Sequence, residues 1–201
     1  MSKIVIIKYN AGNTQSVSYA LERLGVMPLI TDNPDEIRSA DKVIFPGVGE
    51  ASSAMNYLIE RGLDTLIKDL KQPVLGICVG LQLLCKHSEE NDVACMGVFD
   101  VAVRRFEPEN LTQKFKVPQM GWNKLHSLEG KLFAGLPAEN YVYFVHSYYA
   151  ELSPYTIAKT DYIHDFSAAL HKDNFYALQF HTEKSGEVGA KILENFLNLV
   201  G

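Results

Sequence analysis

Several features are scarce in this sequence of 201 residues, and each scarcity excludes a class of protein. Only three cysteines are present and none forms a C-x-x-C pair, which argues against a disulfide framework and against a zinc site. No apolar run is long enough to span a bilayer. The net charge of -5 disfavours a nucleic-acid-binding face. No Walker A or dinucleotide-binding motif occurs.

The remaining composition is typical of a soluble globular protein, with 47% hydrophobic and 21% charged residues. No linker, repeat or low-complexity segment divides the chain, so we expect a single domain over residues 1–201. The N-terminal segment MSKIVIIKYN predicts a first strand and lacks the cleavage site of a secretory signal. Few cysteines, in odd number, favour a reducing compartment, and the cytoplasm is the expected location.

The first half of the chain alternates short apolar strands with helices. Strands are predicted at residues 3–9, 26–30, 43–45 and 73–77, and helices at residues 14–24, from Pro34, at 50–70 with a break near Gly62, and at 79–87. Asn13 is expected to cap the first of these helices. Such a β-α-β-α order implies a parallel sheet covered by helices on both faces.

From about Gly97 the pattern changes to strands separated by turns. The strand-like segments are GVFDVAVRRF, YVYFVHSYYAEL, YTIAKT and FYALQF, and one last helix is predicted at residues 187–199. We therefore expect the second half to add a largely antiparallel portion to an α/β fold.

A cysteine lies where the fourth strand gives way to a helix. Gly76-Ile77-Cys78-Val79-Gly80 has the form G-x-C-x-G, the cysteine version of a nucleophile elbow. Glycines permit the tight turn, unpaired N–H groups at the helix start favour a thiolate, and the Val79 N–H can donate to an oxyanion. On this motif alone, Cys78 is equally well explained as a small core residue.

His181 has the best position among the six histidines for a catalytic base. The strand at 176–180 runs into His181, Thr182 and Glu183, and residues two apart in an extended chain point to the same side. Glu183 can therefore orient His181 while the other ring nitrogen faces Cys78. Both segments follow strands, and sites in parallel sheets form at the carboxyl ends of strands. The other two cysteines lack such a frame and are predicted to be structural.

Four separated motifs carry a resemblance to known proteins. GICVGLQLL, QFHTEKSG and PGVG resemble the class I (triad) glutamine amidotransferases. Within that class, PGVG, VPQMGWN, YFVHSYY and EKSG resemble the glutaminase subunits of imidazole glycerol phosphate synthases. The resemblance covers essentially the whole chain and implies a flavodoxin-like, mostly parallel sheet flanked by helices. Thr182, Gln119 and Val79 stand where proline, histidine and leucine are more usual, but none of these departures removes a group from the triad.

The resemblance implies a role for each matching position. Cys78 would attack the side-chain amide of glutamine, His181 would transfer the proton, and Glu183 would hold His181. No metal or organic cofactor is expected. The oxyanion loop would comprise Gly47, Val48 and Gly49 together with Val79, and the substrate contacts would be Gln82, Ser147 and Tyr148.

An ammonia acceptor site is missing from the sequence, so the acceptor is expected on another chain. The resemblance implies a (β/α)8-barrel cyclase as the partner in a heterodimer, which takes ammonia through a channel and forms imidazole glycerol phosphate and aminoimidazole carboxamide ribonucleotide. Trp122 follows Gly121 in an expected loop and would face the cyclase. A partly buried core position is the alternative for this tryptophan.

Other functions remain open from the sequence. The nearest is the glutaminase subunit of anthranilate, guanylate or carbamoyl phosphate synthesis. A cysteine redox or stress protein on a flavodoxin-like sheet would need the elbow but not the His-x-Glu segment. A non-catalytic binding module is disfavoured because Cys78, His181 and Glu183 are all present.

Overall fold

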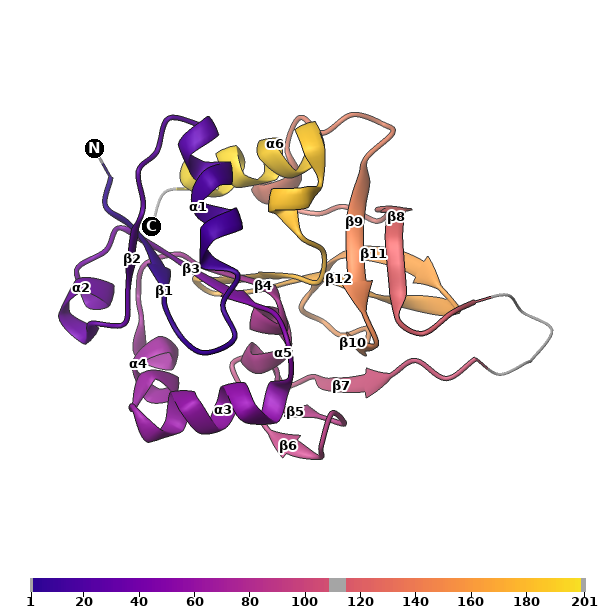
Figure 1. Ribbon diagram of the computed structural model, residues 1–201. Coiled ribbons are helices and arrows are strands. Elements are labelled where there is room, and N and C mark those ends of the chain that lie inside the picture. The colour runs from indigo at the N-terminus through magenta and orange to yellow at the C-terminus, as the bar shows by residue number, and fades with distance from the viewer. Residues whose placement is uncertain (1, 109–114, 200–201) are drawn as a thin grey trace.

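A parallel sheet forms the centre of the molecule in the computed structural model, which describes residues 2–108 and 115–199 (Figure 1). Its strands lie side by side in the order β2 (Leu29–Thr31), β1 (Ile4–Ile7), β3 (Lys42–Gly47), β4 (Val74–Cys78) and β13 (Phe175–Leu178). All four pairings between these strands are parallel. This order is that of the flavodoxin-like sheets, as the sequence predicts.

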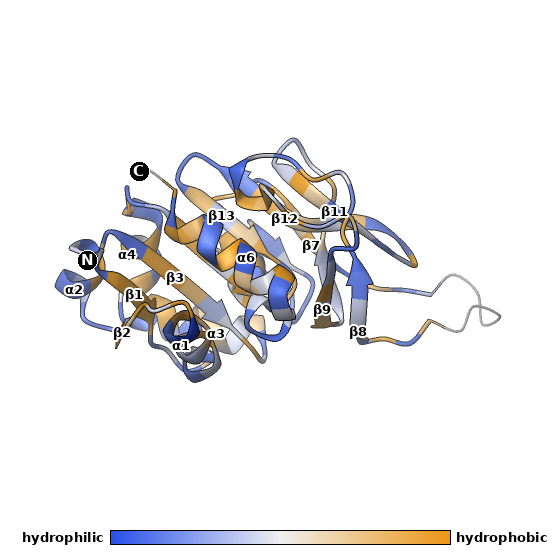
Figure 2. Cartoon of the chain, turned by 90° about the horizontal axis from the view of Figure 1, so that it is seen from above, coloured by the Kyte–Doolittle hydropathy of each residue, from blue (hydrophilic) through white to orange (hydrophobic). Residues whose placement is uncertain are grey.

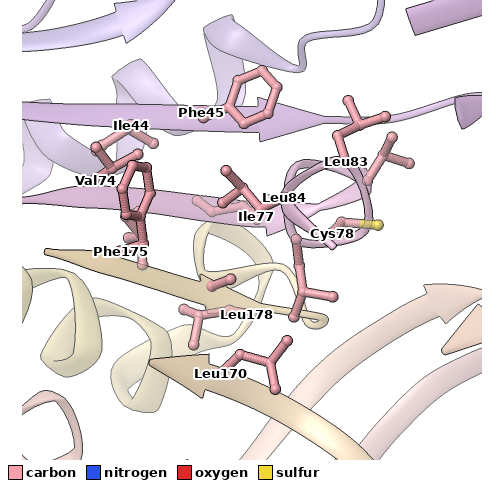
Figure 3. Close-up of a cluster of buried hydrophobic side chains, with 14 of the residues drawn as sticks. Ile44, Phe45, Val74, Ile77, Cys78, Leu83, Leu84, Leu170, Phe175 and Leu178 are labelled. Atoms are coloured by element: carbon pink, nitrogen blue, oxygen red, sulfur yellow. The ribbon is translucent and has the colours of Figure 1, made fainter. Parts of the chain in front are cut away.

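The central strands are apolar along their whole length because helices cover both faces of the sheet. Every residue of β1 (IVII) and of β4 (VLGIC) is buried. Figure 3 shows Ile77 of β4 in a cluster of aliphatic side chains that includes Leu83 and Leu84 of the following helix, with Cys78 at the strand end. Burial on both faces therefore fixes the position of the β4 end.

Helices lie on both faces of the sheet (Figure 1). One face carries α1 (Thr14–Arg23) and α6 (Gly186–Leu197), the other carries α3 (Ala51–Glu60), α4 (Leu63–Asp69) and α5 (Val79–Leu84), and α2 (Pro34–Arg38) lies beside β2 and β1. Figure 2 shows both hydrophilic and hydrophobic residues along α6, whose buried residues include Val188, Ile192 and Phe196. Within residues 2–108 and 115–199, no helix has the length and apolarity needed to cross a membrane.

A largely antiparallel portion extends the sheet beyond β13, as predicted. The added strands, in spatial order, are β12 (His164–Lys172), β10 (Tyr148–Ala150), β7 (Ala102–Arg105), β5 (His87–Ser88) and β6 (Val93–Ala94), with β11 (Thr156–Tyr162) paired to β12. Among the described strands of this portion, only the β5–β7 pairing is parallel. A separate two-stranded sheet joins β8 (Gln119–Lys124) to β9 (Tyr141–His146). Two short 3-10 helices are η1 (Lys131–Phe133) and η2 (Thr182–Lys184).

Some predicted elements differ from the structure. The helix predicted at 79–87 ends at Leu84, because Cys85 is extended and residues 87–88 pair with β6 and β7. The strand predicted at 26–30 is found at Leu29–Thr31, and β12 was not predicted. Asn13 occupies the cap position of α1 but makes no capping hydrogen bond, and its side-chain amide nitrogen donates to Glu183.

Candidate active site

Cys78 occupies a strained turn between β4 and α5. Its φ of 55° and ψ of -111° place a non-glycine residue in a region that costs free energy and that is found at nucleophile elbows. A Cβ at Gly80 would overlap the carbonyl of Phe45, and one at Gly76 would lie 2.8 Å from Leu84 Cδ1. The two glycines therefore allow the close contacts predicted for the elbow.

His181 and Glu183 form a buried pair beside the elbow. Nδ1 of His181 lies 2.7 Å from Oε1 of Glu183, and the two side chains are 2% and 1% exposed. Burial lowers the pKa of His181, but interactions with Cys78 and Glu183 outweigh it and raise that pKa to about 10. The imidazole of His181 is therefore protonated near pH 7, beside Cys78 and Glu183.

Cys78 is one of the two partners that raise the pKa of His181. Nε2 of His181 is buried and makes no hydrogen bond to any residue in the described part of the chain. Catalytic hydrogen bonds are often long without substrate and shorten when it binds. The arrangement therefore leaves room for the imidazole to approach the sulfur or a leaving group.

Gln179 completes the surroundings of the thiol, and the sequence analysis missed it. Its Nε2 donates to Cys78 Sγ at 3.8 Å, and its Oε1 accepts from Gln82 Nε2 at 3.1 Å. Gln82 also donates to the Tyr148 carbonyl at 3.0 Å. The signal was available, because Gln179 precedes His181 by two residues and so shares its side of the chain. Gln82 is buried rather than exposed, and its amide nitrogen is held by two acceptors.

The loop after β3 does not direct the Val48 N–H at the thiol. Gly47 is the ladder partner of Cys78, which places the loop beside the elbow. The Val48 N–H instead donates to the Ala11 carbonyl at 2.6 Å. Gly49 has a φ of 91°, a conformation that favours glycine. The Gly47–Val48 peptide would have to rotate before its N–H could meet an oxyanion.

A cavity of about 300 Å³ opens beside Cys78, a size suited to a small molecule. It brings together most of the predicted site residues: Val48, Gly49, Cys78, Val79, Gln82, Ser147, Tyr148 and His181. Four further residues, not predicted from the sequence, complete the lining: Glu90, Pro118, Val145 and His146. Glu183 lies behind His181 and is absent from the lining.

Glu90 is the acidic residue of the cavity lining in the part of the chain that the structure describes. One carboxylate oxygen, Oε2, accepts from the Ala51 N–H at 2.7 Å. Burial raises the pKa of Glu90, and this hydrogen bond opposes the effect. No local motif marks Glu90, because it faces the cavity only through the turn after β5. The Glu90 carboxylate can therefore bind a positively charged group of a ligand in the cavity.

His146 holds the far wall of the cavity. Its Nδ1 donates to the Tyr148 carbonyl at 2.7 Å, and its Nε2 lies 3.0 Å from the Gln119 side-chain amide. Burial lowers the pKa of His146 to about 4, so the ring is neutral near pH 7. Its role is therefore to fix the segment from 146 to 148 rather than to carry charge.

Trp122 is exposed, which rules out the core alternative. It lies in β8, not in the expected loop, and its ladder partner is Tyr143. The side chains of Met120 and Trp122 are two residues apart on one side of β8, and these residues are 66% and 57% exposed, whereas Gln119 is buried. Met120 and Trp122 therefore form an exposed apolar patch on β8. The first residue of this strand, Gln119, contacts His146, which lines the cavity.

Metal chemistry has no evident ligand set here. Within residues 2–108 and 115–199, no group of three or more His, Cys, Asp or Glu side chains is arranged to hold a metal ion. The three cysteines are free thiols.

Comparisons with known proteins identify the family of this chain. The family model described as glutamine amidotransferase class-I matches residues 5–200. The chain is 58% identical over 197 residues to the imidazole glycerol phosphate synthase subunit HisH of Bacteroides thetaiotaomicron, covering 98% of this chain and 100% of that protein. It is 45% identical over 211 residues to the HisH subunit of Shewanella oneidensis, covering 98% and 96% of the two chains.

Solved structures share the fold at lower identity. A crystal structure of a glutamine amidotransferase has a TM-score of 0.72 at 18% identity, covering 96% of both chains. PurLQS from Thermotoga maritima has a TM-score of 0.71 at 18% identity, covering 98% of this chain and 99% of the other.

Proposed function

This chain belongs to the class-I glutamine amidotransferase family, and from that premise we propose that it is the glutaminase subunit of an imidazole glycerol phosphate synthase, acting in histidine biosynthesis. The observation that carries the proposal is 58% identity along nearly the whole chain to a subunit of that name. The enzyme hydrolyses L-glutamine to glutamate and ammonia. Residues 1–201 form one amidotransferase domain in the cytoplasm.

Cys78 is the nucleophile of the reaction. Its thiolate attacks the side-chain carbonyl of glutamine, and the protonated His181 gives its proton to the departing ammonia. A γ-glutamyl thioester remains on Cys78. His181, now neutral, takes a proton from water, and the resulting hydroxide releases glutamate and regenerates the thiolate. Glu183, at 2.7 Å from Nδ1, holds the imidazole in the required orientation throughout.

The oxyanion is stabilised by backbone N–H groups rather than by a side chain. Val79 follows the nucleophile at the elbow and supplies one donor. Val48 supplies the second after the Gly47–Val48 peptide has turned from the Ala11 carbonyl, between the two flanking glycines Gly47 and Gly49. The enzyme is consequently slow until this loop is rearranged.

The amino-acid end of glutamine is bound by polar residues of the cavity wall. Gln82, Ser147 and Tyr148 line it and position the substrate backbone. Glu90 accepts from the α-ammonium group, since one of its oxygens is engaged by Ala51 and the other is left for the ligand. A cavity with one acidic wall thus suits a zwitterionic amino acid.

The ammonia acceptor site belongs to a (β/α)8-barrel cyclase that forms a heterodimer with this chain. Val48 is 38% exposed and lines the cavity, and so does Pro118, which lies two residues before Met120 of the Met120–Trp122 patch. Exposed large apolar side chains beside an active site are typical anchors of an interface. Trp122 is therefore assigned to the cyclase interface.

A coupled assay tests the proposal. Purified chain, glutamine and the cyclase subunit with its phosphoribulosyl-formimino substrate should together form imidazole glycerol phosphate at neutral pH. Replacement of that cyclase by an anthranilate or guanylate synthase subunit should leave glutamine unused. Product formation with one of those synthases, and none with the cyclase, would refute the assignment.

A further inference from the structure

Tyr9 carries a buried hydroxyl that the mechanism above leaves unused. The residue is 7% exposed, and its ring packs against Phe45 with centroids 5.2 Å apart. The hydroxyl has no hydrogen-bond partner in residues 2–108 and 115–199. Burial, and secondarily the charge of Cys78, raises the pKa of this phenol, which keeps it a neutral donor. An unpaired buried hydroxyl is costly, so a partner in another state of the protein would explain it.

The hydroxyl lies directly against the oxyanion loop. A Cβ built on Gly47 would stand 2.7 Å from Tyr9 Oη, so the phenol fills the space where any side chain at residue 47 would lie. Asn10 and Asn13, the side-chain donors that follow Tyr9, are engaged by the Ser53 carbonyl at 3.3 Å and by Glu183 at 3.4 Å. Among these three donors, Tyr9 is the one without an acceptor.

When the Gly47–Val48 peptide rotates, the Gly47 carbonyl oxygen needs a new hydrogen-bond donor. In the present state the Val48 N–H donates to the Ala11 carbonyl at 2.6 Å. When that N–H turns into the cavity, the Gly47 carbonyl turns the opposite way, towards the carbonyl of Ala11. Two carbonyl oxygens would then face each other, and a hydrogen bond would have been lost.

We infer that the Tyr9 hydroxyl donates to the Gly47 carbonyl in the rotated state, and so stabilises the active arrangement of the oxyanion loop. Tyr9 is a positioning residue, because it acts on the loop and touches no reacting atom. The inference rests on the proposed glutaminase function. Loss of the hydroxyl lowers the population of the rotated loop and therefore the rate, but leaves glutamine binding unchanged.

The test is Tyr9→Phe, assayed for glutaminase activity in the complex with the cyclase subunit and its phosphoribulosyl substrate. The value of kcat should fall about tenfold, the usual scale of one net hydrogen bond, while KM for glutamine stays within about twofold. The melting temperature should not fall, since the replacement removes a hydroxyl that has no partner in the resting state. Tyr155→Phe, at a tyrosine outside the cavity lining, is the control and should change neither constant.

Three results would overturn the inference. The first is an unchanged kcat in Tyr9→Phe. The second is a raised KM together with a lower melting temperature, which would show that the hydroxyl serves structure alone. The third, no glutamine-dependent rate in the wild-type complex, would overturn the proposed function as well, so the two failures are distinguishable.

Discussion

Nδ1 of His181 lies 2.7 Å from Oε1 of Glu183, and both side chains are almost completely excluded from solvent. His181 lies between β13 and η2 and Glu183 lies in η2, while Cys78 ends the neighbouring strand β4. Parallel pairing of the two strands therefore brings Cys78, the proposed nucleophile, close to the His181–Glu183 pair, which lies about a hundred residues later in the sequence.

Backbone strain at Cys78 predicts an unusual effect on stability. Cys78 has a φ of 55°, where glycine is favoured over any residue with a side chain. Cys78→Gly should therefore be more stable than Cys78→Ala by about 1 kcal/mol in the free energy of unfolding, although both are inactive. Urea unfolding measures the difference. Cys85 is the control, because it is buried and its backbone lies outside the left-handed region, so Cys85→Ala should be more stable than Cys85→Gly. Equal stabilities of Cys78→Gly and Cys78→Ala would contradict the elbow geometry.

The raised pKa of His181 predicts a pH-dependent contribution to stability. The folded pKa is about 10 against an ordinary value of 6.5, so the stabilisation is complete below pH 6.5 and is lost as the pH rises through 10. The excess free energy of unfolding of wild type over His181→Gln should decline across this window. In a Cys78→Ala background the decline should be smaller, because one of the two raising partners is absent. A difference that grows with pH would contradict the assignment.

Glu90 predicts an effect on substrate affinity rather than on turnover. Glu90→Gln keeps an acceptor for the Ala51 N–H but removes the negative charge beside the cavity. We expect KM for glutamine to rise about tenfold or more with little change in kcat, in keeping with the loss of a charge-assisted hydrogen bond. Steady-state kinetics in the presence of the cyclase measure both. Glu89→Gln, outside the cavity lining, is the matched control, and equal KM values for the two variants would exclude the role of Glu90.

The exposed patch on β8 predicts which surface the cyclase covers. Trp122→Ala should weaken heterodimer formation by about 2 kcal/mol or more, as for a central aromatic anchor, and Met120→Ala by a smaller amount. Isothermal titration calorimetry measures the dissociation constants. Met27→Ala offers a matched control, because Met27 is 80% exposed but lies between α1 and β2, away from β8 (Figure 1). Weakening by Met27→Ala and not by Trp122→Ala would place the partner elsewhere.

The elbow and the His-x-Glu segment could be predicted because their signals are local. Two glycines frame Cys78 within five residues, and the alternation of an extended chain relates His181 to Glu183. The parallel half of the sheet was equally accessible, since buried strands such as β1 and β4 are continuous apolar runs.

Features that depend on distant contacts were not predictable. Trp122 was expected in a loop, because no local pattern marks residues 119–124 as a strand. They form β8 only through pairing with β9, which begins at Tyr141. Glu90 faces the cavity because it lies in the turn that follows the two-residue strand β5, where its carboxylate meets the first residue of α3. Asn13 has the residue type of a helix cap, and only the tertiary structure brings Glu183 within 3.4 Å of its amide.

Covalent labelling tests the central claim, that Cys78 is the glutaminase nucleophile, most directly. The chain, in complex with the cyclase, is incubated with the glutamine analogue diazo-oxo-norleucine, and the labelled peptide is mapped by mass spectrometry. One adduct is expected, on Cys78, with loss of glutaminase activity in step with labelling, with protection by glutamine and with no adduct in Cys78→Ala. An adduct on Cys85 or Cys95 in place of Cys78, or full activity after complete labelling elsewhere, would contradict the account.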